Sequence, residues 1–134
     1  MHSINVRMLF VTLILSSLTL ACGFSFSTAN FADAWMAADP EGVERTITYG
    51  QEDTFYAFVD LANAPSGTEV RAVWIAVDIE GEEPNVQLHD VSITSGDSVL
   101  VFDLTSDLPW PIGQYRVDFY LSGELETSLD FQVQ

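Results

Sequence analysis

The chain has 134 residues, of which 20 are Asp or Glu and 4 are Arg or Lys, so its formal net charge is −16. This length suits one domain, and the acidic balance argues against a nucleic-acid partner because phosphate backbones are bound by basic surfaces. A hydrophobic content of 48% with 12% aromatic residues excludes a disordered acidic tail, which stays unfolded only at low hydrophobicity.

The N-terminal segment has the organisation of an export signal. Arg7 precedes an apolar run from Met8 to Ala21, and a run of this length suits a signal peptide, whereas a membrane-spanning helix needs about 20 apolar residues. Residues 18–22 read Leu-Thr-Leu-Ala-Cys and resemble the lipobox of bacterial lipoproteins, with Thr where the lipobox usually has Leu. The resemblance implies that the thiol of Cys22 receives a diacylglyceryl group and that Cys22 becomes the new N-terminus.

Cys22 is the single cysteine of the chain, which excludes an intramolecular disulfide framework and a multi-cysteine zinc site. Two other interpretations stay open, an ordinary secretory signal cut after Ala29 and an uncleaved anchor that reaches Phe26. All three place the rest of the chain outside the cytoplasm. We therefore expect a signal peptide at 1–21, a tether at 22–30 and a domain at 31–134, held on the outer face of a membrane in the cell envelope.

Beyond the tether, β-branched and aromatic residues alternate with polar ones, and turn signals recur about every 8–12 residues, which predicts strands throughout. The fourth predicted strand is apolar on both sides and is expected to be central. The last two are expected to form a hairpin through a Ser-Gly-Glu turn. The predicted strands are 31–37, 44–49, 54–61, 69–79, 86–94, 98–104, 114–121 and 125–133.

Two motifs resemble those of immunoglobulin-like domains. Trp74 lies in the middle of the fourth strand, where such domains bury a Trp between their sheets. Residues 113–117 read Gly-Gln-Tyr-Arg-Val and resemble a tyrosine corner, in which the hydroxyl of Tyr115 bonds to backbone upstream. We expect that partner between residues 105 and 110.

The same resemblance indicates how the two sheets are joined. Antibody domains have a disulfide cysteine two residues after the corner Tyr. This chain has Val117 there, with Val59 or Ala57 as its expected counterpart on the other sheet. The resemblance implies an all-β, immunoglobulin-like sandwich of seven or eight strands, joined by apolar packing. It implies a fold and not an activity.

No residue pattern predicts catalysis. His89 lies in a predicted strand, without the sequence pattern of a nucleophile elbow, and is expected to be a surface histidine. Among so many carboxylates, some pair will always fall at the separation that glycosidases use, so proximity alone predicts nothing. We expect no catalytic residue and no cofactor.

Two segments are candidate binding sites. Four carboxylates lie close together in sequence, and hard cations such as calcium take several carboxylate oxygens; the other interpretation is a solvated loop. Trp110, between two prolines, is either a platform for a sugar or an apolar peptide, or a residue packed under the tyrosine corner. The four carboxylates are Asp78, Glu80, Glu82 and Glu83.

The resulting functional prediction is a lipid-anchored, non-catalytic binding or spacer module, with a protein or a glycan as its partner besides the membrane. The alternative is a secreted hydrolase or a protease-inhibitor-like domain. A cleft with paired carboxylates of raised pKa would favour the hydrolase, and a mobile, protruding loop with an apolar tip would favour the inhibitor. A closed sandwich without a pocket would favour the module.

The acidic composition predicts that salt stabilises the fold. The chain has no Lys, which fits either a high-salt habitat or a GC-rich genome. Screening shortens from about 10 Å at 0.1 M salt to about 3 Å at 1 M, so repulsion among the carboxylates should weaken. We expect the thermal unfolding midpoint to rise between these concentrations of NaCl, a salt chosen over sulfate to limit the strengthening of apolar burial. An unchanged midpoint would show that the carboxylates are too dispersed to matter.

Overall fold

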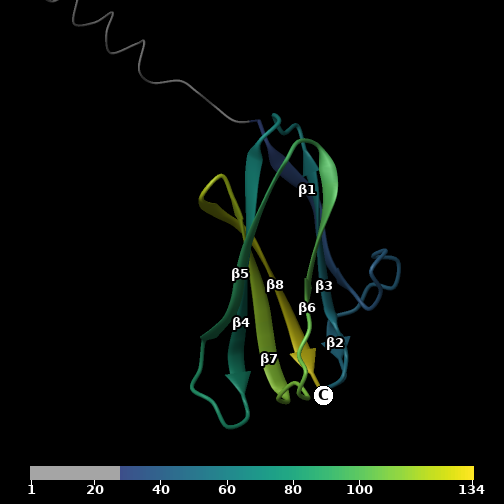
Figure 1. Cartoon of the computed structure of the whole chain (residues 1–134), viewed down its shortest axis with the longest axis vertical. Coiled ribbons are helices and arrows are strands. Elements are labelled where there is room, and N and C mark those ends of the chain that lie inside the picture. The colour runs from purple at the N-terminus through teal and green to yellow at the C-terminus, as the bar shows by residue number, and fades with distance from the viewer. Residues whose placement is uncertain (1–27) are drawn as a thin grey trace, which may run out of the picture.

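The computed structural model describes residues 28–134, which form two β-sheets packed face to face (Figure 1). The smaller sheet has the order β1-β3-β6 and the larger the order β2-β8-β7-β4-β5. Neighbouring strands are antiparallel except for β2 and β8, which are parallel. The strands are β1 (Asn30–Ala37), β2 (Thr48–Tyr49), β3 (Phe55–Ala62), β4 (Thr68–Ile79), β5 (Val86–Ser95), β6 (Ser98–Leu104), β7 (Gly113–Leu121) and β8 (Glu124–Val133).

The predicted strand pattern is confirmed in seven of its eight elements, each within one residue of its expected bounds. The predicted central place of β4 is also confirmed, because β4 pairs with β5 on one side and β7 on the other. The second predicted strand, 44–49, is wrong in extent, since only Thr48 and Tyr49 are strand. The residues before them form a loop in which Ile47 is 62% exposed and Arg45 forms only an isolated bridge with Ala37.

The core between the sheets is built around Phe55, which is fully buried. Its ring lies 4.5 Å from that of Trp110 and 4.7 Å from that of Phe131, centroid to centroid. The rings of Tyr49 and Tyr115 lie at 5.1 and 5.5 Å. Because β3 carries Phe55 and β2, β7 and β8 carry three of these neighbours, the ring cluster joins the smaller sheet to the larger one.

Trp74 and Tyr115 occupy the places that the sequence predicts. Trp74 is fully buried in β4, with its ring 5.9 Å from that of Phe131. The hydroxyl of Tyr115 donates a hydrogen bond to the carbonyl of Pro111 at 2.5 Å, so the partner lies one residue beyond the expected range. Burial raises the pKa of Tyr115 to about 12, and the phenol therefore stays protonated as this bond requires.

Apolar packing stands where antibody domains have their disulfide. Val117 on β7 and both expected counterparts on β3, Val59 and Ala57, are fully buried in one core cluster.

The larger sheet also holds one buried charge on its outer face. The carboxylate of Asp118 accepts hydrogen bonds from Arg116 and Ser128. This pairing satisfies a carboxylate that would otherwise be costly to bury.

The two ends of the sandwich differ in what they carry. The described chain enters at one end, next to β1, and its C-terminus lies at the opposite end (Figure 1). The predicted signal peptide at 1–21, Cys22 and the tether up to residue 27 lie outside the described residues. Among residues 28–134, no helix has the length and apolar character needed to cross a membrane.

We expect a substitution at Tyr115 to cost less unfolding free energy than a substitution at Trp74. Tyr115→Phe leaves the carbonyl of Pro111 without its donor and should cost about 1–3 kcal/mol of unfolding free energy. Trp74→Ala leaves a cavity and should cost about 3–5 kcal/mol. Urea denaturation measures both. Tyr120→Phe is the control, because this ring lies half-buried under Arg71 on the outer face; a Tyr115→Phe loss no larger than that of Tyr120→Phe would contradict a structural corner.

Candidate functional site

The predicted calcium site does not form. Asp78 lies near the end of β4, and the three glutamates lie in the loop that leads to β5, all of them exposed. Nowhere in residues 28–134 do three potential metal ligands converge. Closeness in sequence on an exposed turn did not bring Asp78, Glu80, Glu82 and Glu83 together around one point, so their geometry gives the calcium prediction no support.

Trp110 belongs to the core, which agrees with the second of its two interpretations, a residue packed under the tyrosine corner. Its side chain is 8% exposed, and one ring face stacks on Phe55. Its indole Nε1 donates to the carbonyl of Asp53 at 2.8 Å, and its backbone N–H donates to the carbonyl of Gln51 at 2.8 Å. These bonds hold the ring against the tyrosine corner and leave little of it for a sugar or a peptide.

His89 lies exposed on β5, as expected of a surface strand histidine. Its strand partner is Trp74, which is fully buried. Cys22, the predicted lipidation site, lies outside the described residues.

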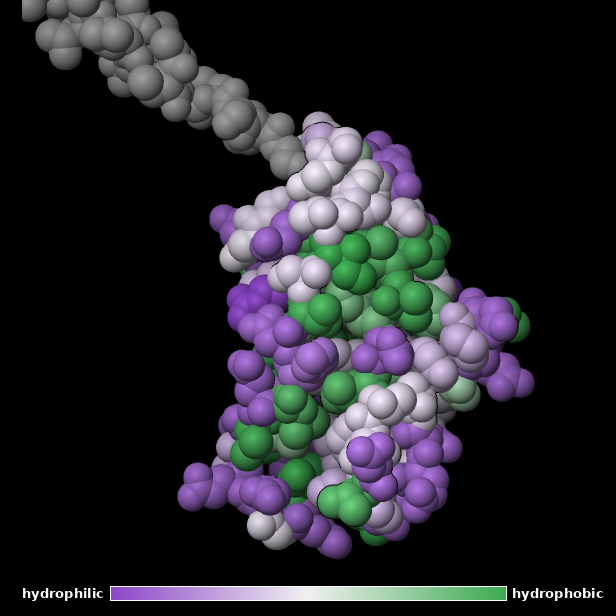
Figure 2. Space-filling view, viewed as in Figure 1, coloured by the Kyte–Doolittle hydropathy of each residue, from purple (hydrophilic) through white to green (hydrophobic). Residues whose placement is uncertain are grey.

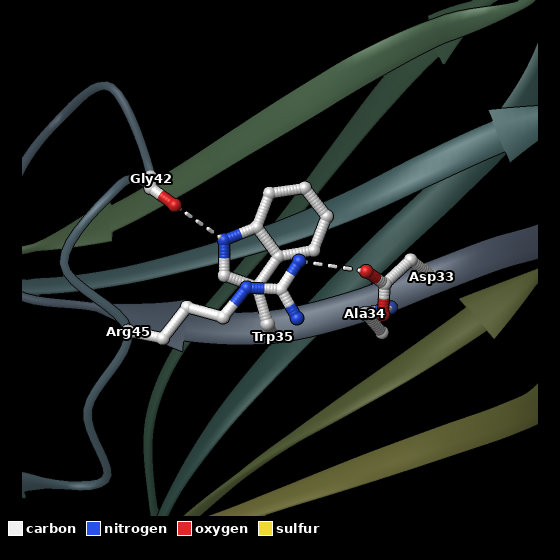
Figure 3. A network of polar contacts seen from close by, with 5 residues as sticks. All are labelled: Asp33, Ala34, Trp35, Gly42 and Arg45. Atoms are coloured by element: carbon white, nitrogen blue, oxygen red, sulfur yellow. Dashed lines mark hydrogen bonds and ion pairs between the residues drawn. The ribbon is translucent and has the colours of Figure 1, made fainter.

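A polar network on the outer face of the smaller sheet was not predicted (Figure 3). The ring of Trp35, on β1, stacks on that of Phe58 at 5.2 Å with an interplanar angle of 9°. The guanidinium carbon of Arg45 lies 4.4 Å from the centroid of the Trp35 ring. The same guanidinium donates a hydrogen bond to a carboxylate oxygen of Asp33 at 2.8 Å. An arginine over a tryptophan face is the favoured cation–π pair, and here it fixes the loop that carries Arg45 to β1.

That loop, residues 38–47 (the β1–β2 loop), is also tied internally. The carboxylate of Asp39 accepts from the backbone N–H groups of Val43 at 3.1 Å and Glu44 at 2.7 Å. The N–H of Glu44 is the main reason why the pKa of Asp39 is lowered. The loop projects from the sandwich (Figure 1), and its Val43 side chain is 79% exposed. The Asp-Pro-Glu-Gly segment is a turn signal in the sequence, but it does not reveal the contact with Trp35.

Gly42 is the point where the loop meets the sheet. Its φ is +76°, and its carbonyl accepts a hydrogen bond from the Trp35 indole at 3.0 Å. A Cβ at this position would lie 3.1 Å from the rings of Phe58 and Trp35. Glycine is therefore required here both by the backbone conformation and by the close approach.

A shallow groove of about 280 Å³ runs along the seam where β1 meets β8, on the other flank of Asp33. We call it the seam groove. Its lining residues are Phe31, Asp33, Ala34, Glu126 and Thr127. The hydrogen bond from Arg45 is the main cause that holds the pKa of Asp33 below its usual value, and burial acts in the opposite direction. The carboxylate of Asp33 is therefore ionised, whereas the general acid of a hydrolase needs a raised pKa.

The architecture is shared with solved structures of other proteins. An immunoglobulin-like protein from Pseudomonas aeruginosa superposes with a TM-score of 0.55 and 9% identity, over 83% of this chain and all of that one. A DNA-bound alkylpurine DNA glycosylase from Pseudomonas fluorescens matches with a TM-score of 0.52 and 16% identity, over 87% of this chain and 33% of its own. A β-glucosidase from Listeria innocua matches with a TM-score of 0.52 and 13% identity, over 83% of this chain and 17% of its own.

These likenesses concern the fold. The chain spans about a third of the glycosylase and about a sixth of the glucosidase, and fold alone does not carry an activity. No family model matches the sequence, and no curated protein matches it. Two packed sheets, a core Trp on β4 and a tyrosine corner on β7, together with the likeness to an immunoglobulin-like protein, establish the domain as an immunoglobulin-like β-sandwich.

We expect Gly42→Ala to destabilise the domain more than the same change at Gly67. Both glycines have positive φ, but a Cβ at Gly67 meets nothing within 4 Å. Gly67→Ala should therefore cost only the backbone strain, about 1–2 kcal/mol, whereas Gly42→Ala adds the displacement of two rings. Urea denaturation of the two variants checks this difference. Equal losses of unfolding free energy would show that the β1–β2 loop can move away from the sheet without further cost.

Proposed function

We propose that the chain is a lipoprotein of the cell envelope whose immunoglobulin-like domain is a non-catalytic binding module, held near a membrane through Cys22. The lipobox-like residues 18–22 after a short apolar run support the anchor. The single cysteine of the chain stands at the one position where a lipobox requires it. A diacylglyceryl group supplies about 0.8 kcal/mol of membrane affinity per buried CH₂, which suits a stable anchor.

The position of β1 supports the same arrangement. Because the described chain enters the domain at one end of the sandwich (Figure 1), an anchor at Cys22 would attach the domain by that end. The residues from Cys22 to Ala29 extend at most about 26–29 Å, so the domain would stay close to the membrane. The opposite end, with the acidic loop between β4 and β5, would face away from it.

The single observation that carries the binding role is the β1–β2 loop. It holds Val43 in solvent on a scaffold tied by Asp39, Gly42 and Arg45. An exposed apolar side chain on a pre-ordered loop loses little conformational entropy when a partner covers it. A pure spacer needs no such feature. We therefore favour binding over spacing.

Two observations bear on the alternatives. An inhibitor-like domain was expected to show a mobile loop, and the bonds of Asp39 and the Arg45–Trp35 contact favour an ordered one. A hydrolase was expected to show paired carboxylates of raised pKa in a cleft, and the pKa of Asp33, which lines the seam groove, is lowered. The seam groove departs from a sandwich without any pocket, but its open form suits a binding surface more than a closed reaction chamber.

The anchor has a direct test. Mass spectrometry of the membrane fraction should find a mature chain that begins at Cys22 and carries a diacylglyceryl adduct on its sulfur. Cys22→Ser should abolish the adduct and leave the leader uncleaved, while Ser25→Ala, three residues on, should change neither. A soluble mature chain that begins at Asn30 in both the parent and Cys22→Ser would refute the proposal in favour of an ordinary secretory signal.

A further inference from the structure

Most edges of the two sheets carry features that keep exposed strands from pairing with other chains. Proteins protect such edges with bulges, very short strands, charges or a covering loop. Three of the four sheet edges in residues 28–134 have at least one of these. β1 is irregular between Phe31 and Asp33 and is bridged to the β1–β2 loop, β5 has an extra residue at Leu88, and β2 is two residues long.

The fourth edge, β6, has none of these features. Its pairing with β3 runs without a break along all seven residues of the strand. Val99 and Val101 are 54% and 43% exposed, and residues 98–102 include no charged residue, Gly or Pro. In the described part of the chain, no strand pairs with the far side of β6. We call this side the open edge, because its backbone N–H and C=O groups are offered to a further strand.

A strand added to the open edge would also cover apolar side chains of the larger sheet. β5 and β6 are the sheet edges on one side of the sandwich (Figure 1), and no strand of the smaller sheet lies beyond β6. Val91 and Ile93 on β5 pack against the core but are only partly buried. Figure 2 shows apolar side chains gathered over part of this side. The inner side chains of an added strand would lie over Val91 and Ile93, which favours apolar residues at alternate positions.

The charges around β6 define the ends of such a strand. Asp97 lies just before β6 and Asp103 near its end, and both are exposed. Neither β3 nor β6 contains a basic residue, and the chain has no Lys. The three arginines in residues 28–134 each pair with an aspartate that belongs to neither strand. Asp97 and Asp103 therefore favour a segment that has Lys or Arg at both ends of its apolar part.

A second copy of this chain suits the open edge less well than such a segment. It would bring the same excess of acidic residues, 20 Asp and Glu against 4 Arg and Lys. Antiparallel pairing of two β6 strands about a two-fold axis would also put the two chain entries at opposite ends of the pair. The anchoring proposed above would then hold only one of these entries near the membrane.

We infer that the open edge binds an extended segment of a partner protein, which adds to the smaller sheet as a further strand through backbone hydrogen bonds. The segment has apolar side chains at alternate positions over five residues, the number between Asp97 and Asp103, and a Lys or Arg at each end. This site lies at the opposite edge of the smaller sheet from β1, so the inference goes beyond the role proposed for the β1–β2 loop.

The probe is the peptide acetyl-Lys-Val-Thr-Val-Thr-Val-Lys-amide, titrated into the ¹⁵N-labelled full chain in zwitterionic detergent micelles at constant ionic strength. We expect saturable shifts of the β6 amides and nuclear Overhauser contacts between the backbones of β6 and the peptide. The same peptide with Glu in place of both Lys should not bind, because it would bring like charges to Asp97 and Asp103. N-methylation of one alternate set of peptide residues should abolish binding, and N-methylation of the other set should preserve it, because only one set donates to β6.

Val101→Lys places a charge on the open edge and should weaken binding roughly two- to tenfold, because it replaces a favourable cross-strand pair with an approach of like charges. Leu125→Lys is the matched control: Leu125 is 56% exposed on β8, and the same change there should leave the Kd unchanged. If Val101→Lys fails to fold, the Glu peptide and the two N-methylated peptides decide, because they are tested on the unaltered chain.

Four results would overturn the inference. The first is the absence of saturable shifts in β6, and the second is equal weakening by Val101→Lys and Leu125→Lys, which would indicate general attraction to an acidic protein. The third is equal binding of both N-methylated peptides, which would exclude strand addition. The fourth is a dimer of the parent chain in sedimentation that Val101→Lys dissociates, which would assign the edge to a second copy. Loss of binding in Val43→Ser but not in Val101→Lys would move the peptide to the β1–β2 loop, and the Cys22 adduct is measured independently of all these results.

Discussion

Phe55 lies between the two sheets, and its ring contacts rings from four strands of the larger sheet and from the loop before β7. Its contacts with Trp110 at 4.5 Å and Phe131 at 4.7 Å are the shortest of the set. Aromatic pairs in such arrangements contribute about 0.5–1.5 kcal/mol each beyond the area they bury. Immunoglobulin domains with an inter-sheet disulfide join their sheets covalently. Here several ring contacts that converge on one side chain make that connection, and the tyrosine corner holds the loop that supplies Trp110.

The ring cluster also explains what the sequence could and could not predict. Strand positions follow from the alternation of side chains, which depends only on near neighbours along the chain. The burial of Trp110 depends on its contacts with Asp53 and Phe55, which are distant in sequence. Two interpretations of Trp110 therefore remained open until the fold was known. The same holds for residues 44–47, which were predicted as part of a strand: in the structure Arg45 forms only an isolated bridge with Ala37, and its side chain stacks on the ring of Trp35.

The candidate sites were less predictable than the fold. The calcium prediction rested on Asp78 and glutamates that are close to it in sequence. Asp33 and Glu126 are far apart in the chain, and they line one groove only because β1 and β8 lie side by side in the fold. The strand irregularities beside the groove, at Phe31–Asp33 in β1 and at Leu125–Thr127 in β8, contain no Gly or Pro that would predict them. The surface as a whole has apolar side chains gathered over part of one face, with hydrophilic residues predominating at the lower end (Figure 2). Composition indicated the charge but not this distribution.

The opposite placement of the chain's entry and of its C-terminus has a mechanical consequence. The two ends lie at the two ends of the long axis (Figure 1), so tension between them would act along the strands. In β1 and β8, which carry the ends of the described chain, the ladder bonds to β3 and β7 would then be loaded in shear, many at once, instead of being opened one after another. A domain pulled at its two ends would thus resist force through the pairing of β1 with β3 and of β7 with β8, the latter matched from Gly113–Val133 to Leu121–Glu124.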